Sequence, residues 1–163
     1  HRVDRRQRQM CIRDRSRRVP PGVGVLVTSD HGMVDVPVHR QVVLEAEHLD
    51  GVRHIGGEPR MLHVYVEPDA DAAVVAERWR RDLEGLADVG TGQEAIASGF
   101  FGPEVTSAAA TRIGDVLVVA RGNGAVYDGT AADQRGRGMI GQHGGLTPEE
   151  RQVPLLRFGA FAR

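Results

Sequence analysis

Two residues of metal-binding type stand side by side directly after an apolar run. Residues 23–28 (Val-Gly-Val-Leu-Val-Thr) are mostly aliphatic and β-branched, which predicts a strand buried on both of its faces. Asp30 and His31 come after this run, and Gly32 then lets the chain turn freely. A carboxylate beside an imidazole suits Zn²⁺, or Mn²⁺ if further oxygen ligands join them. The alternative interpretation is a strand end with an Asx-turn and a solvated histidine.

A further histidine, His143, lies in a glycine-rich stretch (residues 141–145, Gly-Gln-His-Gly-Gly) just before a predicted helix. Residues 147–150 (Thr-Pro-Glu-Glu) form a capping box with proline at the first helical position, so a short helix is expected there. The glycines beside His143 let the backbone come close to other groups, which favours a presented imidazole. Because His143 is far from Asp30 and His31 in the sequence, only the fold can bring the three together. The alternative is an ordinary loop histidine.

The composition is that of a single domain with a basic head. The chain has 163 residues, of which 40% are hydrophobic, enough to bury a core. Every basic residue is Arg, and no apolar run reaches the roughly 18–20 residues that a membrane helix needs. Because Cys11 is the only cysteine, the sequence offers no disulfide framework and no thiolate metal site.

The basic head differs from the rest of the chain. Residues 1–18 contain eight Arg against two Asp, whereas acids outnumber Arg in the remainder. Residues 10–14 (Met-Cys-Ile-Arg-Asp) are similar to the conceptual translation of a transposase adapter used in sequencing libraries. We therefore expect residues 1–18 to be non-native and not to contribute to the fold, with a disordered basic tail as the alternative.

The middle of the chain predicts a small lobe of strands and helices. Alternation over residues 61–66 predicts a strand, and Asp69 or Asp71 can cap the helix that follows it. Apolar residues recur along that helix at helical spacing: Val75, Trp79, Leu83 and Leu86. The further expected elements are a loop at 51–59, a short helix at 94–98, a buried strand at 113–120, a long glycine-rich loop at 122–141 and a closing strand at 153–158. Together they indicate an α+β lobe, at about residues 55–120, inserted between parts of a larger sheet.

Three short motifs carry a resemblance to a known family. They are residues 28–33 (Thr-Ser-Asp-His-Gly-Met), 57–60 (Gly-Glu-Pro-Arg) and 141–144 (Gly-Gln-His-Gly). In combination they resemble the alkaline phosphatase superfamily, and within it the nucleotide pyrophosphatase/phosphodiesterase type. The resemblance implies an α/β fold for residues 19–163, the C-terminal part of an alkaline-phosphatase-like sheet flanked by helices, with the α+β lobe inserted.

The same resemblance implies a site and an activity. The resemblance implies a site with two divalent metal ions, Zn²⁺ or, as the alternative, Mn²⁺. Asp30 and His31 would be ligands of one ion and His143 a ligand of the other. The family's Thr or Ser nucleophile would lie upstream, so no catalytic residue is assigned here and the chain by itself is expected to be inactive. The implied activity is hydrolysis of a phosphodiester, pyrophosphate or other phosphate ester. The implied partner is a small phosphate ester or nucleotide, not nucleic acid or a membrane.

Other interpretations remain open at this point. An upstream Ser or formylglycine would instead indicate a phosphomutase, phosphatase or sulfatase of the same superfamily. A non-catalytic α/β domain would result if the three ligands never converge. Arg60 could face a phosphate or form a structural ion pair with a nearby acid. We expect the remaining histidines of the body to be structural or solvated: His39, His48, His54 and His63. The sequence favours a cytoplasmic location only slightly and indicates no oligomeric state.

Overall fold

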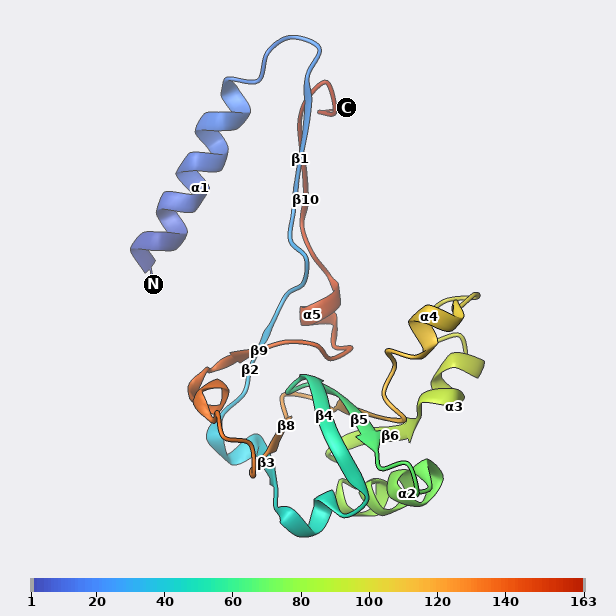
Figure 1. The fold of residues 1–163 in the computed structure, drawn as a ribbon. Coiled ribbons are helices and arrows are strands. Elements are labelled where there is room, and N and C mark those ends of the chain that lie inside the picture. The colour runs from blue at the N-terminus through green and yellow to red at the C-terminus, as the bar shows by residue number, and fades with distance from the viewer. Residues whose placement is uncertain (1, 163) are drawn as a thin grey trace. The chain divides into compact units, whose positions relative to one another are not determined.

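The structure is a computed structural model in which residues 2–162 are described. The chain divides into two compact units (Figure 1). One unit runs up to His31 and resumes at Gln152, and the other is Gly32–Arg151.

The first unit is a helix and a two-stranded ribbon. Helix α1 is Arg2–Arg17, and strands β1 (Gly24–Thr28) and β10 (Leu155–Gly159) pair antiparallel. The sequence predicts both strands. The expected burial of β1 on both of its faces is wrong within this unit. Leu26 remains 54% exposed because β10 is the one strand that pairs with β1 in the described residues.

Helix α1 covers most of the basic head. Residues 1–18 are expected to be non-native, and that origin stays a prediction. Cys11 is exposed on the helix and forms no disulfide. No helix among residues 2–162 combines the length and apolar character needed to cross a membrane.

The second unit is built on a four-stranded antiparallel sheet with the order β4-β5-β7-β6. Its strands are β4 (Val52–Glu58), β5 (Met61–Val66), β6 (Ala87–Thr91) and β7 (Val116–Ala120). The alternation that predicts β5 has a direct consequence: Leu62 and Val64 lie opposite Val118 and Val116 and are buried with them. The strand predictions for 61–66 and 113–120 are confirmed.

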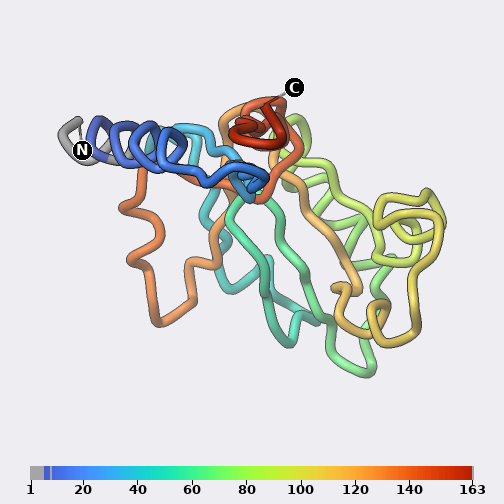
Figure 2. The backbone as a smooth tube through the Cα atoms, turned by 90° about the horizontal axis from the view of Figure 1, so that it is seen from above, coloured from blue at the N-terminus to red at the C-terminus, as the bar shows by residue number. Residues whose placement is uncertain are grey.

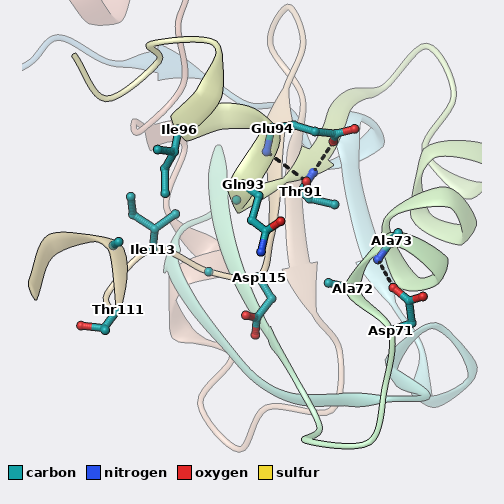
Figure 3. A pocket seen from close by; sticks show the side chains of 13 residues that line it. Asp71, Ala72, Ala73, Thr91, Gln93, Glu94, Ile96, Thr111, Ile113 and Asp115 are labelled. Carbon is teal, nitrogen blue, oxygen red and sulfur yellow. Dashed lines mark hydrogen bonds between the residues drawn. The ribbon is translucent and has the colours of Figure 1, made fainter. Parts of the chain in front are cut away.

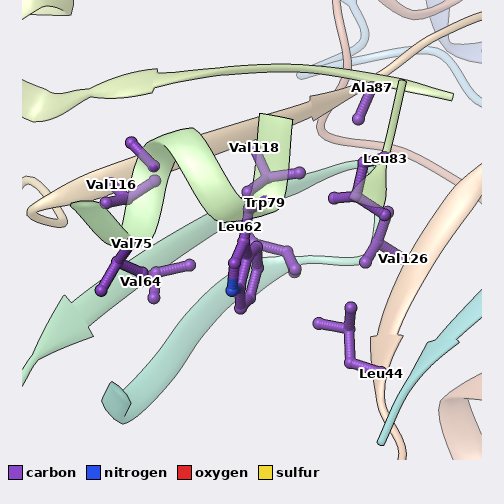
Figure 4. Close-up of a cluster of buried hydrophobic side chains, with 11 residues drawn as sticks. Leu44, Leu62, Val64, Val75, Trp79, Leu83, Ala87, Val116, Val118 and Val126 are labelled. Carbon is purple, nitrogen blue, oxygen red and sulfur yellow. The ribbon is translucent and has the colours of Figure 1, made fainter. Parts of the chain in front are cut away.

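Helix α2 (Ala72–Asp82) covers one face of this sheet (Figure 4). Asp71 is its N-cap and accepts a hydrogen bond from the backbone N–H of Ala73 (2.8 Å), as the sequence allows. The predicted apolar stripe forms the core through Val75, Trp79 and Leu83, but Leu86 lies beyond the end of the helix and is 40% exposed. The Trp79 indole N–H donates to the carbonyl of His48 (2.9 Å), so its one polar atom is satisfied.

Shorter elements complete the second unit. Strand β3 (Gln41–Leu44) pairs parallel with β8 (Ala125–Asp128), and β2 (Val34–Asp35) pairs antiparallel with β9 (Gly141–Gln142). The helices are α3 (Gly92–Ala97), α4 (Ser107–Ala110) and α5 (Pro148–Arg151), with 3₁₀ turns at Val38–Arg40, Ala46–Leu49 and Arg135–Gly138. Helix α3 contacts β6, and Figure 1 shows α3 and α4 away from β3. In the tube view the yellow-green to yellow segment around residues 92–110 again lies at one side of the chain (Figure 2).

Two predicted loops contain strands. Residues 51–59 are expected to be a loop, yet β4 occupies most of them as an edge strand, where glycines such as Gly56 are tolerated because β5 supplies the pairing. The long loop at 122–141 contains β8, which is too short to show a period in sequence and forms by pairing with β3. The sheet and α2 lie within residues 52–120, and the insertion of a lobe at about 55–120 into a larger sheet stays a prediction.

Trp79→Ala should destabilise the second unit strongly. The side chain is 1% exposed, and removing a buried aromatic typically costs about 3–5 kcal/mol. Urea unfolding followed by circular dichroism measures the change, because the variant has no tryptophan fluorescence. Val74→Ala on the same helix is 63% exposed and should change stability by less than about 0.5 kcal/mol. Equal losses in the two variants would contradict this description of the core.

Candidate functional site

Asp30 and His31 lie directly after β1, in the first unit. The backbone N–H of His31 donates to Oδ1 of Asp30 (3.0 Å), and this hydrogen bond holds the pKa of the Asp30 carboxyl below its ordinary value. The Ser29 hydroxyl donates to the carbonyl of His31 (2.6 Å), which closes the turn. Oδ2 of Asp30 lies 3.8 Å from Nε2 of His31. An ionised carboxylate and an imidazole are therefore presented together at the strand end.

Gly32, the next residue, is fixed against helix α5. Its backbone N–H donates to the carbonyl of Glu150 (2.8 Å). A Cβ atom at this position would lie 1.9 Å from the carbonyl oxygen of Glu149. No side chain fits there, so the glycine of the Asp-His-Gly motif is required by a close backbone approach.

His143 lies in the second unit, on the short connection between β9 and α5. Its Nε2 is 4.0 Å from Oε2 of Glu58, at the end of β4. Gly144 adopts φ +108°, and a Cβ atom there would lie 2.8 Å from Cβ of Glu58. The glycine after His143 thus lets the loop lie directly on the β4–β5 hairpin.

Arg60 forms a structural ion pair, the second of the two roles left open by the sequence. It occupies the β4–β5 turn and is 0% exposed, and its partner Glu150 on α5 is 3% exposed. Nε and Nη2 donate to the two carboxylate oxygens at 2.7 and 2.9 Å, a bidentate arrangement. The remaining guanidinium contacts go to the carbonyls of Gly122 and Gly124 in the β7–β8 turn. Arg60 therefore makes its four guanidinium hydrogen bonds inside the protein.

Glu150 accepts from a second set of donors as well. The backbone N–H of Gly145 donates to Oε1 (2.8 Å), and the Thr147 hydroxyl and backbone N–H donate to Oε2 (2.7 and 3.2 Å). Burial by itself would raise the pKa of Glu150, but the hydrogen bonds from Arg60, Thr147 and Gly145 outweigh it and lower the pKa to about 2. The carboxylate is thus charged at neutral pH although it is buried.

Sequence reasoning missed Glu150 as the partner of Arg60. Its place in the predicted capping box at 147–150 is confirmed in part, because its side chain accepts from the Thr147 backbone N–H. The capping box was the one sequence signal that pointed to Glu150, and a capping box does not reveal that its carboxylate is buried beside an arginine. Arg60 and Glu150 are 90 positions apart, so their pairing follows from the tertiary fold.

The other histidines serve local structure or face solvent. Nδ1 of His48 accepts from the backbone N–H of Glu45 (3.0 Å), His54 stacks on a tyrosine ring, and His39 is exposed. Nδ1 of His63 accepts from a backbone N–H (3.1 Å), and burial lowers the pKa of His63. This agrees with the structural or solvated roles that the sequence indicates.

A pocket of about 600 Å³ lies near the N-terminal ends of α2 and α3 (Figure 3). It contains none of the predicted metal ligands. Its three carboxylates already accept local hydrogen bonds: Asp71 caps α2, Glu94 accepts from Thr91 (2.7 Å), and Asp115 accepts from Val66 (2.9 Å). These bonds explain the carboxylates without a ligand.

The predicted ligands have the right chemistry for a metal. Asp30 and His31 supply a carboxylate and an imidazole that are 87% and 36% exposed, and the His143 imidazole is 32% exposed. These donors fit Zn²⁺. Within residues 2–162, no three or more His, Cys, Asp or Glu side chains form a group that could hold a metal ion. That Asp30, His31 and His143 share one two-metal centre stays a prediction.

Comparison with solved structures shows a partial alkaline-phosphatase-like α/β fold, which confirms the predicted fold class. Human ectonucleotide pyrophosphatase/phosphodiesterase 5 aligns with a TM-score of 0.63 and 14% identity over 86% of this chain and 34% of its own. Phosphonoacetate hydrolase from Sinorhizobium meliloti 1021, solved with phosphonoacetate, has a TM-score of 0.57 and 22% identity, and the alignment covers 83% of this chain and 36% of the hydrolase. An inactive variant of murine ectonucleotide pyrophosphatase/phosphodiesterase 5, solved with AMP, has a TM-score of 0.60 and 18% identity, and the alignment covers 85% of this chain and 34% of the murine protein. The chain spans about a third of these proteins.

The sequence itself matches a family profile. The type I phosphodiesterase/nucleotide pyrophosphatase profile matches residues 1–146, which is most of the chain. No curated protein matches the sequence. The chain therefore belongs to the type I phosphodiesterase/nucleotide pyrophosphatase family, as its three motifs predict.

Gly32→Ala should destabilise the second unit by about 1–3 kcal/mol or more, because the new methyl group would overlap the Glu149 carbonyl. Urea unfolding measures the loss. Gly136→Ala is a matched control, since nothing lies within 4 Å of a Cβ there, and it should stay within about 0.5 kcal/mol of the parent. A Gly32→Ala protein as stable as the control would show that the close approach to α5 is absent.

The buried Glu150 carboxylate should make stability depend on acid. Its pKa is about 2 when folded against 4.5 ordinarily, so its contribution is complete above about pH 4.5 and is lost as pH falls toward 2. The parent should therefore lose about 2 kcal/mol relative to Glu150→Gln between pH 5 and pH 3. Urea unfolding of both proteins across this range measures the difference, in which the other acids cancel. A constant difference would contradict the low pKa.

Proposed function

We propose that this chain is the metal-binding C-terminal part of a phosphoric ester hydrolase. Family membership supports the reaction class. The observation that carries the assignment of the site is that Glu150 accepts hydrogen bonds from the backbone beside both histidine motifs. Its carbonyl accepts from the N–H of Gly32, the residue after His31, and its carboxylate accepts from the N–H of Gly145, two residues after His143. Such shared anchoring suits motifs that act together.

In the proposed site, Asp30 and His31 bind one divalent ion and His143 binds another, with Zn²⁺ preferred and Mn²⁺ as the alternative. Two bound divalent ions would stabilise the attacking and leaving oxygens of an in-line displacement. An aspartate is ordinarily ionised at neutral pH, and the hydrogen bond from the His31 backbone N–H lowers the pKa of Asp30 further, so the carboxylate can bind a cation without first losing a proton. Oε2 of Glu58 lies 4.0 Å from Nε2 of His143, beyond hydrogen-bond distance, so in this proposal the carboxylate acts on the imidazole through its charge.

The proposed substrate is a small phosphate ester or nucleotide. The AMP and the phosphonoacetate in the structures of two similar proteins support a small phosphorus-containing anion as ligand. Since this chain corresponds to about a third of those proteins and none of its residues is assigned as nucleophile, we propose that the 163 residues alone do not turn over substrate.

Metal titration tests the proposed ligands. Isothermal titration calorimetry of the 163-residue chain with Zn²⁺ should detect weak binding that falls about tenfold or more in His143→Ala and in His31→Ala. His39→Ala is the matched control, because His39 is exposed and outside the motifs, and it should bind as the parent does. Binding that is equal in all four proteins would refute the assignment.

Hydrolysis of bis(4-nitrophenyl) phosphate tests the inactivity of the chain alone. With Zn²⁺ present, the rate should equal that of His143→Ala and of buffer. A rate above buffer that His143→Ala abolishes would overturn the proposed inactivity and would still support His143 as a site residue.

A further inference from the structure

The Arg60–Glu150 pair is unusual for its burial. With exposures of 0% and 3%, both charges are removed from water, which costs several kcal/mol per ion. The exposed ion pairs of the same unit, such as Arg121–Asp88, carry no such cost. Apolar side chains of similar volume often stabilise a protein as well as a buried pair does. Stability alone therefore does not explain why charges are placed here.

The pair provides directed hydrogen bonds that apolar side chains could not replace. Glu150 accepts from the backbone N–H of Gly145, two residues after His143. A Cβ atom on Gly145 would lie 2.8 Å from Oε2 of Glu150 and 2.9 Å from Nη2 of Arg60, so the loop backbone rests directly on the pair. The orientation of the His143 loop thus depends on the position of the carboxylate.

Arg60 in turn holds the carboxylate in one position. Its two donors fix both oxygens of Glu150, and its contacts with Gly122 and Gly124 join it to the β7–β8 turn. The backbone carbonyl of Arg60 also accepts from Ala120 at the end of β7 (2.9 Å). The pair therefore connects helix α5 to the main sheet.

Helix α5 carries the second connection. The carbonyl of Glu150 accepts from Gly32, which directly follows His31, and the Glu149 carbonyl leaves no room for a side chain at that residue. Fixing the Glu150 side chain therefore also fixes the Glu150 backbone carbonyl, which accepts the hydrogen bond from Gly32, the last residue of the Asp-His-Gly motif.

We propose that Arg60 and Glu150 form a positioning pair that sets the orientation of the His143 loop and of Gly32, and so the metal affinity of the ligands beside them. This rests on the proposed metal site. Neither residue contacts the metal or the substrate in this proposal, and both act through the backbone of the ligand-bearing segments.

The test separates positioning from stability with an apolar double variant, Arg60→Met/Glu150→Leu. We expect its Tm, followed by circular dichroism, to lie near that of the parent, whereas each single substitution lowers Tm because it leaves one charge buried and unpaired. Although the double variant keeps a Tm near that of the parent, its amide hydrogen exchange at Gly145 should be about tenfold or more faster than in the parent. Its Zn²⁺ affinity should be about tenfold lower.

Asp88→Asn is the matched control, since it breaks an ion pair of the same unit that is exposed. It should leave Gly145 exchange and Zn²⁺ affinity unchanged. Parent-like exchange and affinity in the double variant would overturn the positioning role and leave the pair as a structural feature.

Arg60→Lys keeps the test decisive if the double variant does not fold. It retains the charge but not the fork that holds both carboxylate oxygens, so Gly145 exchange should still accelerate in a folded protein. Unchanged exchange would overturn the proposal. Hydrogen exchange at Gly145 tests the role of the pair and does not depend on metal. Zn²⁺ binding that is unchanged in His143→Ala would refute the proposed metal site, and the exchange result would still decide whether the pair positions the loop.

Discussion

Within the second unit, the positions of helix α5 and of the loop that carries His143 depend on one buried ion pair. Arg60 and Glu150 are withdrawn from water, and the cost is offset because every charged oxygen and most guanidinium N–H groups are hydrogen-bonded. The pair links helix α5 and the loop that carries His143 to the β4–β5 turn and the β7–β8 turn. A short helix such as α5 has little stability of its own, so this anchoring decides where it lies.

The glycines of the motifs follow from the same constraint. Gly32, Gly144 and Gly145 each bring the backbone so close to α5, Glu58 or the ion pair that a side chain would overlap a neighbouring atom. The histidine motifs are therefore also packing motifs. Their glycines set the path of the backbone, and the neighbouring Asp30, His31 and His143 supply the donors that we propose for metal binding.

Membership in the type I phosphodiesterase/nucleotide pyrophosphatase family and the partial alkaline-phosphatase-like fold agree with this arrangement. The exposed donors and the buried anchor have separate tasks. The Asp30 and His143 side chains are 87% and 32% exposed, whereas Arg60 and Glu150 are withdrawn from solvent. In the proposed function, this separation lets the protein hold its ligands firmly without competing for the metal.

Local patterns in the sequence determined the family, the candidate ligands, strand β5, the Asp71 cap and the apolar stripe of α2. The strand, the cap and the stripe depend on residues within a few positions of one another, where periodicity and capping chemistry act, and the family and the candidate ligands follow from three short motifs read in combination. Only the tertiary structure decided that Arg60 faces Glu150 rather than a phosphate, that β4 and β8 are strands, and that the strand before Asp30 keeps exposed side chains. Those features depend on partners far away in the sequence, because strand pairing and charge burial are set by whichever segments the fold brings into contact.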